Sequence, residues 1–106
     1  MKDGIYYVSF RSNQQDFGNG IVTINKGKVN GGDYAYIYQG EIDDNSSVLK
    51  ITRFNEQATS VFGPLKEFYL DLKVNSSTGE PILEGNVQGR PEFKIQIYSK
   101  LLAPLA

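Results

Sequence analysis

The chain has 106 residues, of which 40% are hydrophobic and 22% are charged. This length and composition predict one globular domain over residues 1–106 and exclude a disordered chain. Eleven basic and twelve acidic residues leave a net charge of −1. That balance argues against direct binding to nucleic acid or to an anionic membrane, because both need a broad positive field.

The sequence contains neither Cys nor His. Their absence removes disulfides, thiolate metal sites and the commonest general base at neutral pH. We therefore predict a protein that binds rather than catalyses, with no catalytic residue, no metal and no cofactor. The apolar runs are far shorter than the roughly 20 residues that span a bilayer, and no signal-peptide pattern follows Lys2. We expect a cytoplasmic protein without membrane insertion.

The first part of the chain predicts three strands. Aromatic and β-branched residues dominate residues 5–11, and alternation resumes over residues 17–25. Residues 25–28 predict a tight turn in which Gly27 takes a positive φ, leading to a short strand near Val29.

The middle of the chain begins with a predicted break at the Gly-Gly-Asp sequence of residues 31–33. The strand expected over residues 34–39 places its three tyrosines on one face, by the two-residue period of a strand. A polar, acidic loop covers residues 41–47, and residues 48–54 alternate again. The least patterned stretch, residues 55–64, is expected to be a crossing or a lid.

The last part of the chain predicts three more strands. Residues 68–74 give the cleanest alternation, and further strands are expected at 83–87 and 93–98. A turn is expected at residues 75–79, and residues 101–106 end the sequence in an apolar tail.

Seven or eight short strands separated by Gly, Asn, Ser and Pro turns predict an all-β fold, in the form of a small antiparallel up-and-down barrel of about eight strands. Closure removes the exposed edges of a flat sheet, and such a barrel is either filled or holds one small ligand. The side chains expected inside, as core or as cavity lining, are Tyr6, Val8, Phe10, Val22, Ile24, Leu49, Ile51, Phe68, Leu70, Leu72, Leu83, Val87, Phe93, Ile95 and Ile97.

Two groups of residues invite a functional interpretation. The acidic residues Glu41, Asp43 and Asp44 lack the spacing of an EF-hand loop, so a solvated turn or a protein contact is favoured over a metal site. The seven tyrosines suit cross-strand packing, a pocket or an interface. Stacking on single-stranded nucleic acid is disfavoured, because such platforms accompany a basic groove.

Six short segments are spread along the chain: Met-Lys-Asp-Gly-Ile-Tyr at the start, Gly-Asn-Gly-Ile-Val at 18–22, Gly-Gly-Asp at 31–33, Tyr-Gln-Gly at 38–40, Ile-Thr-Arg-Phe-Asn at 51–55 and Ala-Pro-Leu near the end. Together these segments resemble the GrlR family. The resemblance covers nearly the whole chain, and it rests on turn and strand pieces rather than on a catalytic signature.

The resemblance implies a lipocalin-like barrel with an apolar cavity, a homodimer, and negative regulation of type III secretion genes, a virulence function, by sequestering a DNA-binding activator. In that family four consecutive acidic residues after the Tyr-Gln-Gly strand are implicated in holding the activator. Here only Asp43 and Asp44 of the matching run are acidic. The partner-binding residues implied are Glu41, Asp43, Asp44, Asn45, Ser46 and Ser47.

Two functions remain open from the sequence: an anti-activator that binds a transcription regulator, and a barrel that carries an apolar, lipid-like ligand. The second requires an open interior. Apolar character on both faces of residues 5–10 and 34–38 favours an outer face covered by a second subunit.

Overall fold

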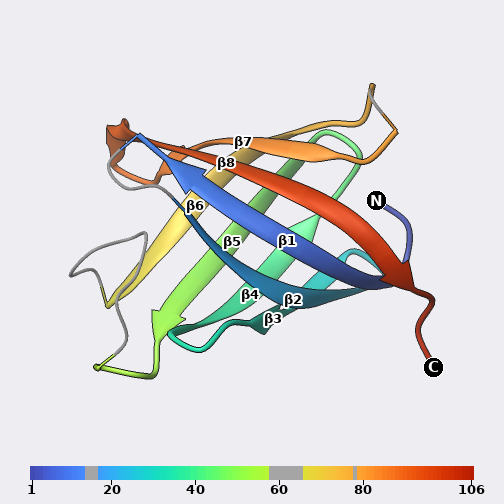
Figure 1. Ribbon diagram of the computed structural model, residues 1–106. Coiled ribbons are helices and arrows are strands. Elements are labelled where there is room, and N and C mark those ends of the chain that lie inside the picture. Colours follow the sequence, from blue (N-terminus) through green and yellow to red (C-terminus); the bar gives the residue numbers. More distant parts are fainter. Residues whose placement is uncertain (14–16, 58–65, 78) are drawn as a thin grey trace.

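The computed structural model describes residues 1–13, 17–57, 66–77 and 79–106. Each strand pairs antiparallel with the next, and the first strand also pairs with the last, so the sheet closes into a barrel (Figure 1). The described residues include no helix. The predicted all-β, up-and-down barrel is therefore confirmed. Its strands are β1 (Gly4–Ser12), β2 (Phe17–Asn25), β3 (Lys28–Gly32), β4 (Tyr36–Ile42), β5 (Ser46–Arg53), β6 (Glu67–Asn75), β7 (Ile82–Val87) and β8 (Arg90–Ala103).

Alternating side chains fill the barrel interior. In β6, Phe68, Leu70 and Leu72 are buried, whereas Tyr69 between them is exposed. Burying one large apolar side chain contributes roughly 1.5–3 kcal/mol, so this alternation drives the sheet to curl around its apolar face. Every side chain expected inside is buried. The structure also buries Val29, Ala35, Tyr36, Tyr38 and Ile42, which the alternation did not select.

A glycine allows two strands to approach closely beside the core. A Cβ atom on Gly31 would lie only 2.1 Å from the carbonyl oxygen of Ile21. Across β3 and β4, Gly31 pairs with Tyr38, whose ring lies 4.9 Å from that of Phe10. The chain break predicted at 31–33 is wrong at Gly31 and Gly32, because β3 continues through both residues. Since glycine has no side chain, the strands can pack closely at these positions.

A turn at Asp33 corrects the predicted arrangement of the tyrosines. One oxygen of Asp33 accepts hydrogen bonds from the backbone N–H groups of Ala35 and Tyr36, each at 2.7 Å. This turn interrupts the alternation, so β4 begins at Tyr36 and not at Tyr34. The side chain of Tyr34 is 64% exposed, whereas Tyr36 and Tyr38 are fully buried.

The turn between β2 and β3 is the one that the sequence predicts. Gly27 has a φ of 78° and Lys26 a φ of 52°. Two central residues with positive φ characterise the type I′ turn, whose twist matches that of the strands it joins.

The last strand is longer than predicted. It was expected over 93–98, but β8 extends to Ala103 and so includes half of the expected apolar tail. The cause is barrel closure, since Ile5 at the start of β1 pairs with Ala103. The pairing satisfies backbone groups that would otherwise form an open edge.

The expected crossing or lid at 55–64 falls mostly on residues 58–65, which lie outside the described part of the chain. Its described beginning is anchored at the turn before β4. Phe54 N–H donates to the carbonyl oxygen of Ala35 at 3.0 Å, and the Asn55 amide donates to the carbonyl oxygen of Tyr34 at 3.1 Å. These two hydrogen bonds attach the end of the Ile-Thr-Arg-Phe-Asn segment to the turn before β4.

Candidate functional site

The acidic hairpin between β4 and β5 is held in one conformation by Asp43. Its backbone N–H donates to the carbonyl oxygen of Ser46 at 2.9 Å. Its side chain accepts from the N–H groups of Asn45 and Ser46, at 2.7 and 2.8 Å. These backbone hydrogen bonds, that from Asn45 first, hold the pKa of Asp43 below its ordinary value. The exposed carboxylate is therefore negatively charged at neutral pH.

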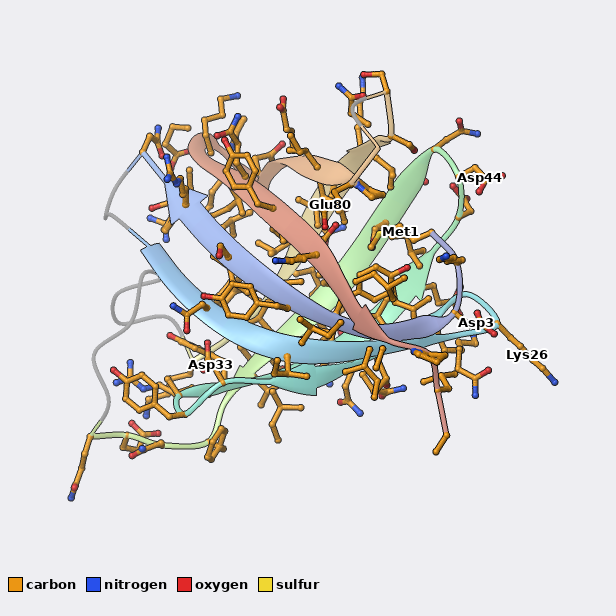
Figure 2. All side chains as sticks on the ribbon, turned by 45° about the vertical axis from the view of Figure 1, so that its right-hand side comes forward. Met1, Asp3, Lys26, Asp33, Asp44 and Glu80 are labelled. Carbon is orange, nitrogen blue, oxygen red and sulfur yellow. The ribbon has the colours of Figure 1, made fainter. Side chains whose placement is uncertain are left out.

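Asp44 lies at the tip of this hairpin with its carboxylate available. The residue is exposed, and no described residue forms an ion pair or a hydrogen bond with its side chain. Figure 2 shows it projecting from the barrel end at which Met1, Asp3 and Lys26 also lie. Among the charged residues expected to bind a partner, Asp44 is the one whose carboxylate has no ion pair or hydrogen bond with a described residue.

Glu41 is exposed as well, but a lysine neutralises it. The Lys28 ammonium group pairs with the Glu41 carboxylate across β3 and β4. The hydrogen bond from Lys28 lowers the pKa of Glu41 below its ordinary value. Glu41 is therefore negatively charged, but the positive charge of Lys28 largely cancels its electrostatic field.

Ser47 differs from the other expected partner-binding residues. Its side chain is 3% exposed, and its hydroxyl donates to the carbonyl oxygen of Glu41 at 2.8 Å. Asn45 is exposed, and its carbonyl oxygen accepts from the Val74 N–H of β6 at 2.9 Å. The structure thus gathers Glu41, Asp43, Asp44, Asn45 and Ser46 on the surface and directs Ser47 inward.

Two apolar side chains lie on the outer surface beside the hairpin. Val48 is 46% exposed and pairs with Glu41 across β4 and β5. Tyr69 is 41% exposed and pairs with Lys50 across β5 and β6. The sequence offered Tyr69 as one of seven tyrosines suited to packing, a pocket or an interface, and it did not select Val48. It placed neither side chain beside the hairpin, because the position of each strand in the closed barrel decides this.

The N-terminal segment, which sequence reasoning also missed, crosses this barrel end. The Tyr6 hydroxyl donates to the carbonyl oxygen of Lys2 at 2.6 Å. The Asp3 carboxylate accepts from the Lys26 N–H at 2.9 Å. Burial first, and then the nearby Asp3 charge, raise the pKa of Tyr6 above its ordinary value. No pattern in the sequence signals these contacts, since the segment has no strand periodicity.

The barrel interior is packed. The described residues enclose a cavity of about 30 Å³, roughly the share of one water molecule in the liquid. Drug-sized ligands occupy pockets of roughly 300–1,000 Å³, so the described interior has no room for a lipid-like ligand. Seven of the side chains expected inside line this space: Val8, Phe10, Val22, Ile24, Leu49, Leu83 and Ile97. The other eight are buried in the packed remainder: Tyr6, Ile51, Phe68, Leu70, Leu72, Val87, Phe93 and Ile95.

An exposed apolar band crosses the outer face of β1 to β4. Tyr7 pairs with Ile21, Ile21 with Gly32, and Gly32 with Ile37, so the four residues form one cross-strand row. Tyr7, Ile21 and Ile37 are 38%, 44% and 42% exposed, respectively. The outward-facing side chains of the segments 5–10 and 34–38 therefore lie in one row across four strands, which we call the apolar band.

Metal coordination finds no support in the described residues, which include no group of three or more acidic, His or Cys side chains that could hold an ion. The described part of the chain also contains no helix with the length and hydrophobicity of a membrane span.

Comparison with known proteins connects this geometry to a family. The family model described as "T3SS negative regulator, GrlR", in which T3SS denotes the type III secretion system, matches residues 1–104. A search of curated proteins found no match. The family match covers every strand of the barrel and the acidic hairpin.

Proposed function

Because the chain belongs to the GrlR family of negative regulators of type III secretion, we propose that it represses type III secretion genes by binding a transcriptional activator through the β4–β5 hairpin. The observation that carries this proposal is the exposed, unengaged carboxylate of Asp44 on a tip whose turn the Asp43 side chain closes with two hydrogen bonds. A preorganised tip loses little conformational entropy on binding.

The charge of the hairpin suits an activator that binds DNA. Such proteins carry Lys and Arg on the surface that meets the phosphates. The carboxylates of Asp43 and Asp44 offer that surface the same sign of charge as DNA does. A hairpin bound there would keep the activator from its promoter, which accounts for repression without any contact between this protein and nucleic acid.

Charge alone would give a weak complex, because exposed charges mainly set the association rate and the orientation of partners. The neighbouring Val48 and Tyr69 supply apolar area of the kind that slows dissociation. We therefore place both side chains in the contact, with Asp43 and Asp44 guiding the approach.

The test is the binding of purified protein to the DNA-binding activator of type III secretion genes from the same bacterium, with rates measured by surface plasmon resonance. Asp44→Lys is expected to lower the association rate about tenfold and to weaken its dependence on salt, because the attractive charge becomes repulsive. Tyr69→Ala is expected to act mainly on the dissociation rate.

The matched control is Glu84→Lys, which makes the same charge change at an exposed position on β7. It is expected to leave both rates unchanged. Asp43→Asn keeps the side-chain oxygen that the turn needs and removes only the charge, so it separates charge from folding of the hairpin. Equal association rates for the wild type and Asp44→Lys would eliminate the hairpin as the contact.

Three further features belong to this proposal. The protein acts by binding and without catalysis, in keeping with a sequence that has neither His nor Cys. It acts in the cytoplasm, where a DNA-binding activator works. It forms a homodimer in which the apolar band lies against a second copy, since exposed apolar side chains arranged in one row favour a protein contact over solvent.

A further inference from the structure

A groove with an excess of positive charge lies on the outer face of β6, β7, β8 and β1, which are neighbours in the closed barrel (Figure 1). It has a volume of about 890 Å³, and its cations are Arg11, Lys73 and Lys94. One described lining residue, Glu84, is acidic, and its carboxylate accepts a hydrogen bond from Gln96 at 3.3 Å. We call this surface the positive groove.

The register of the strands places cations at both sides of the positive groove. Glu84 in its middle pairs with Lys73 on β6 and with Gln96 on β8. Gln96 pairs in turn with Arg11 on β1. Lys94 lies two residues before Gln96, so the two-residue period of a strand directs both side chains to the outer face. The three cations therefore face solvent around a single acidic side chain.

The lysines of the positive groove have no charge partner in the part of the chain that the structure describes. No described residue forms an ion pair or a side-chain hydrogen bond with the ammonium group of Lys73 or Lys94. The guanidinium carbon of Arg11 lies 5.4 Å from the centroid of the Tyr98 ring, a contact that orients this group without neutralising it. The groove is therefore open to an anionic partner.

Asn13 fixes one wall of the groove through the backbone of β8. Its side-chain oxygen accepts from the Lys94 N–H at 2.9 Å, and its amide donates to the carbonyl oxygen of Glu92 at 2.8 Å. A wall held in this way loses little conformational entropy when a partner binds. The described lining includes no aromatic side chain on which the bases of single-stranded nucleic acid could stack, so the groove favours an acidic protein segment.

The chain itself carries a segment of that kind, the acidic hairpin with Asp43 and Asp44. The hairpin tip is exposed and closed by hydrogen bonds, and the carboxylate of Asp44 has no partner among the described residues. Ser46 pairs with Lys73 in the sheet, yet neither aspartate forms an ion pair with this lysine. The hairpin therefore does not neutralise the groove of its own chain.

We propose that the positive groove binds the acidic hairpin of a second copy of this chain, with the carboxylate of Asp44 beside the ammonium groups of Lys73 and Lys94. A net charge of only −1 opposes the approach of two copies weakly. Exposed ion pairs each contribute little, so the contact is weak and depends on salt. It shares no residue with the apolar band, so both contacts can form together.

This contact has a consequence for regulation. A copy whose hairpin lies in the groove of another copy cannot offer the same hairpin to an activator. Self-association would therefore lower the amount of protein that is free to repress. This consequence rests on the proposed function, whereas the contact between copies does not, and it is tested without any activator present.

The test exploits the absence of cysteine from the chain. Asn45→Cys carries a single nitroxide spin label on the hairpin, and this protein is mixed with isotope-labelled wild type for NMR. Since the observed copy has no nitroxide, every broadened amide signal reports a contact between copies. The amides of Glu84, Asn86 and Gln96 are expected to broaden. The broadening should be lost at about 1 M salt, where the Debye length is about 3 Å.

Charge reversal then identifies the groups in contact. Lys73→Glu with Lys94→Glu in the observed copy is expected to abolish the broadening, because the groove then repels the hairpin. Adding Asp44→Lys to the spin-labelled copy is expected to restore it, a result that a misfolded groove could not give. The matched control, Lys66→Glu with Lys100→Glu, makes the same charge change at exposed positions outside the groove and should leave the broadening unchanged.

Three results would overturn the proposal. The groove amides could stay sharp, the hairpin could broaden a different face of the barrel, or the broadening could survive Lys73→Glu with Lys94→Glu. A dimer through the apolar band alone gives the last two results, because its contacts do not involve these lysines.

Discussion

A single carboxylate, that of Asp33, determines which tyrosines enter the core. One of its oxygens accepts two backbone N–H groups and so forms the turn before β4. The other accepts the hydroxyl of Tyr38, which is fully buried. The buried phenol needs this partner, because an unpaired polar group inside a protein costs about 1–3 kcal/mol. Burial first, and then the hydrogen bond to Asp33, raise the pKa of Tyr38 far above its ordinary value.

Tyr38→Phe is therefore expected to destabilise the barrel by about 1–2 kcal/mol at neutral pH, because a hydrogen bond to a charged group is lost while the ring is retained. Urea unfolding followed by circular dichroism measures this change. Tyr98→Phe is the control, since Tyr98 is exposed and its hydroxyl makes only a 3.3 Å contact with Gln96. It should change the stability by less than about 0.5 kcal/mol.

The pH dependence of the Tyr38→Phe effect tests the shifted pKa. In the unfolded chain Tyr38 ionises near its ordinary value of 10.0, whereas in the barrel it stays protonated. The stability that it contributes is fully present below pH 10 and is lost as the pH rises further. The difference between the wild type and Tyr38→Phe should therefore shrink by about 1.4 kcal/mol per pH unit above pH 10. A constant difference would show that the phenol ionises normally.

At the scale of the strands, glycine sets how tightly the barrel can curl. Gly31 lies against the backbone of β2, and a Cβ atom there would also be 2.6 Å from the Cα of Val22. Real Cβ atoms do not approach other atoms this closely, so any side chain at this position must push β2 and β3 apart. The displaced backbone would disturb the pairing on which closure depends.

Gly31→Ala is expected to cost about 3 kcal/mol, at the upper end of the range for overpacking. Gly79→Ala separates this steric effect from backbone strain. Gly79 has a φ of 92° with nothing within 4 Å of a Cβ atom, so its substitution carries only the conformational cost of about 1 kcal/mol. Thermal unfolding of both variants measures the comparison. Equal destabilisation would mean that close strand approach contributes nothing.

The strands themselves were largely predictable, because alternation over stretches such as 68–74 leaves one assignment for each face. Their ends were not. The turn at Asp33 depends on a side-chain hydrogen bond, and the continuation of β3 through Gly31 depends on packing against β2. The length of β8 depends on pairing with β1 at the other end of the chain. Local sequence carries no signal for such long-range contacts.

At the scale of the whole molecule, closure places distant segments side by side. The N-terminal segment, the turn at 25–28 and the hairpin at 43–45 meet at one barrel end. The sequence identified the hairpin from its charge and its place in the family pattern. It could not reveal that Lys28 neutralises Glu41, that Ser47 faces inward, or that Met1 packs against the core, since each depends on the barrel register.

Closure also creates the apolar band. Strands β1 and β4 are not neighbours, and Ile21 and Gly32 of the intervening strands connect Tyr7 to Ile37. Gly32 contributes no side chain, so the exposed apolar area of the band comes from Tyr7, Ile21 and Ile37. In a dimer with twofold symmetry the same band on the second copy would face it, and each contact residue would be used twice.

Ile21→Lys is therefore expected to convert a micromolar dimer into a monomer. Losing a buried isoleucine costs about 2 kcal/mol, and twofold symmetry doubles this, which raises the dimer Kd on the order of a thousandfold. Light scattering across a dilution series measures the Kd. Val48→Lys is the matched control, because Val48 is 46% exposed on β5, away from the band, and its substitution should leave the dimer intact. A monomeric wild type at micromolar concentration would show that a second copy does not cover the band, and an unchanged dimer in Ile21→Lys would place the dimer contact on another face.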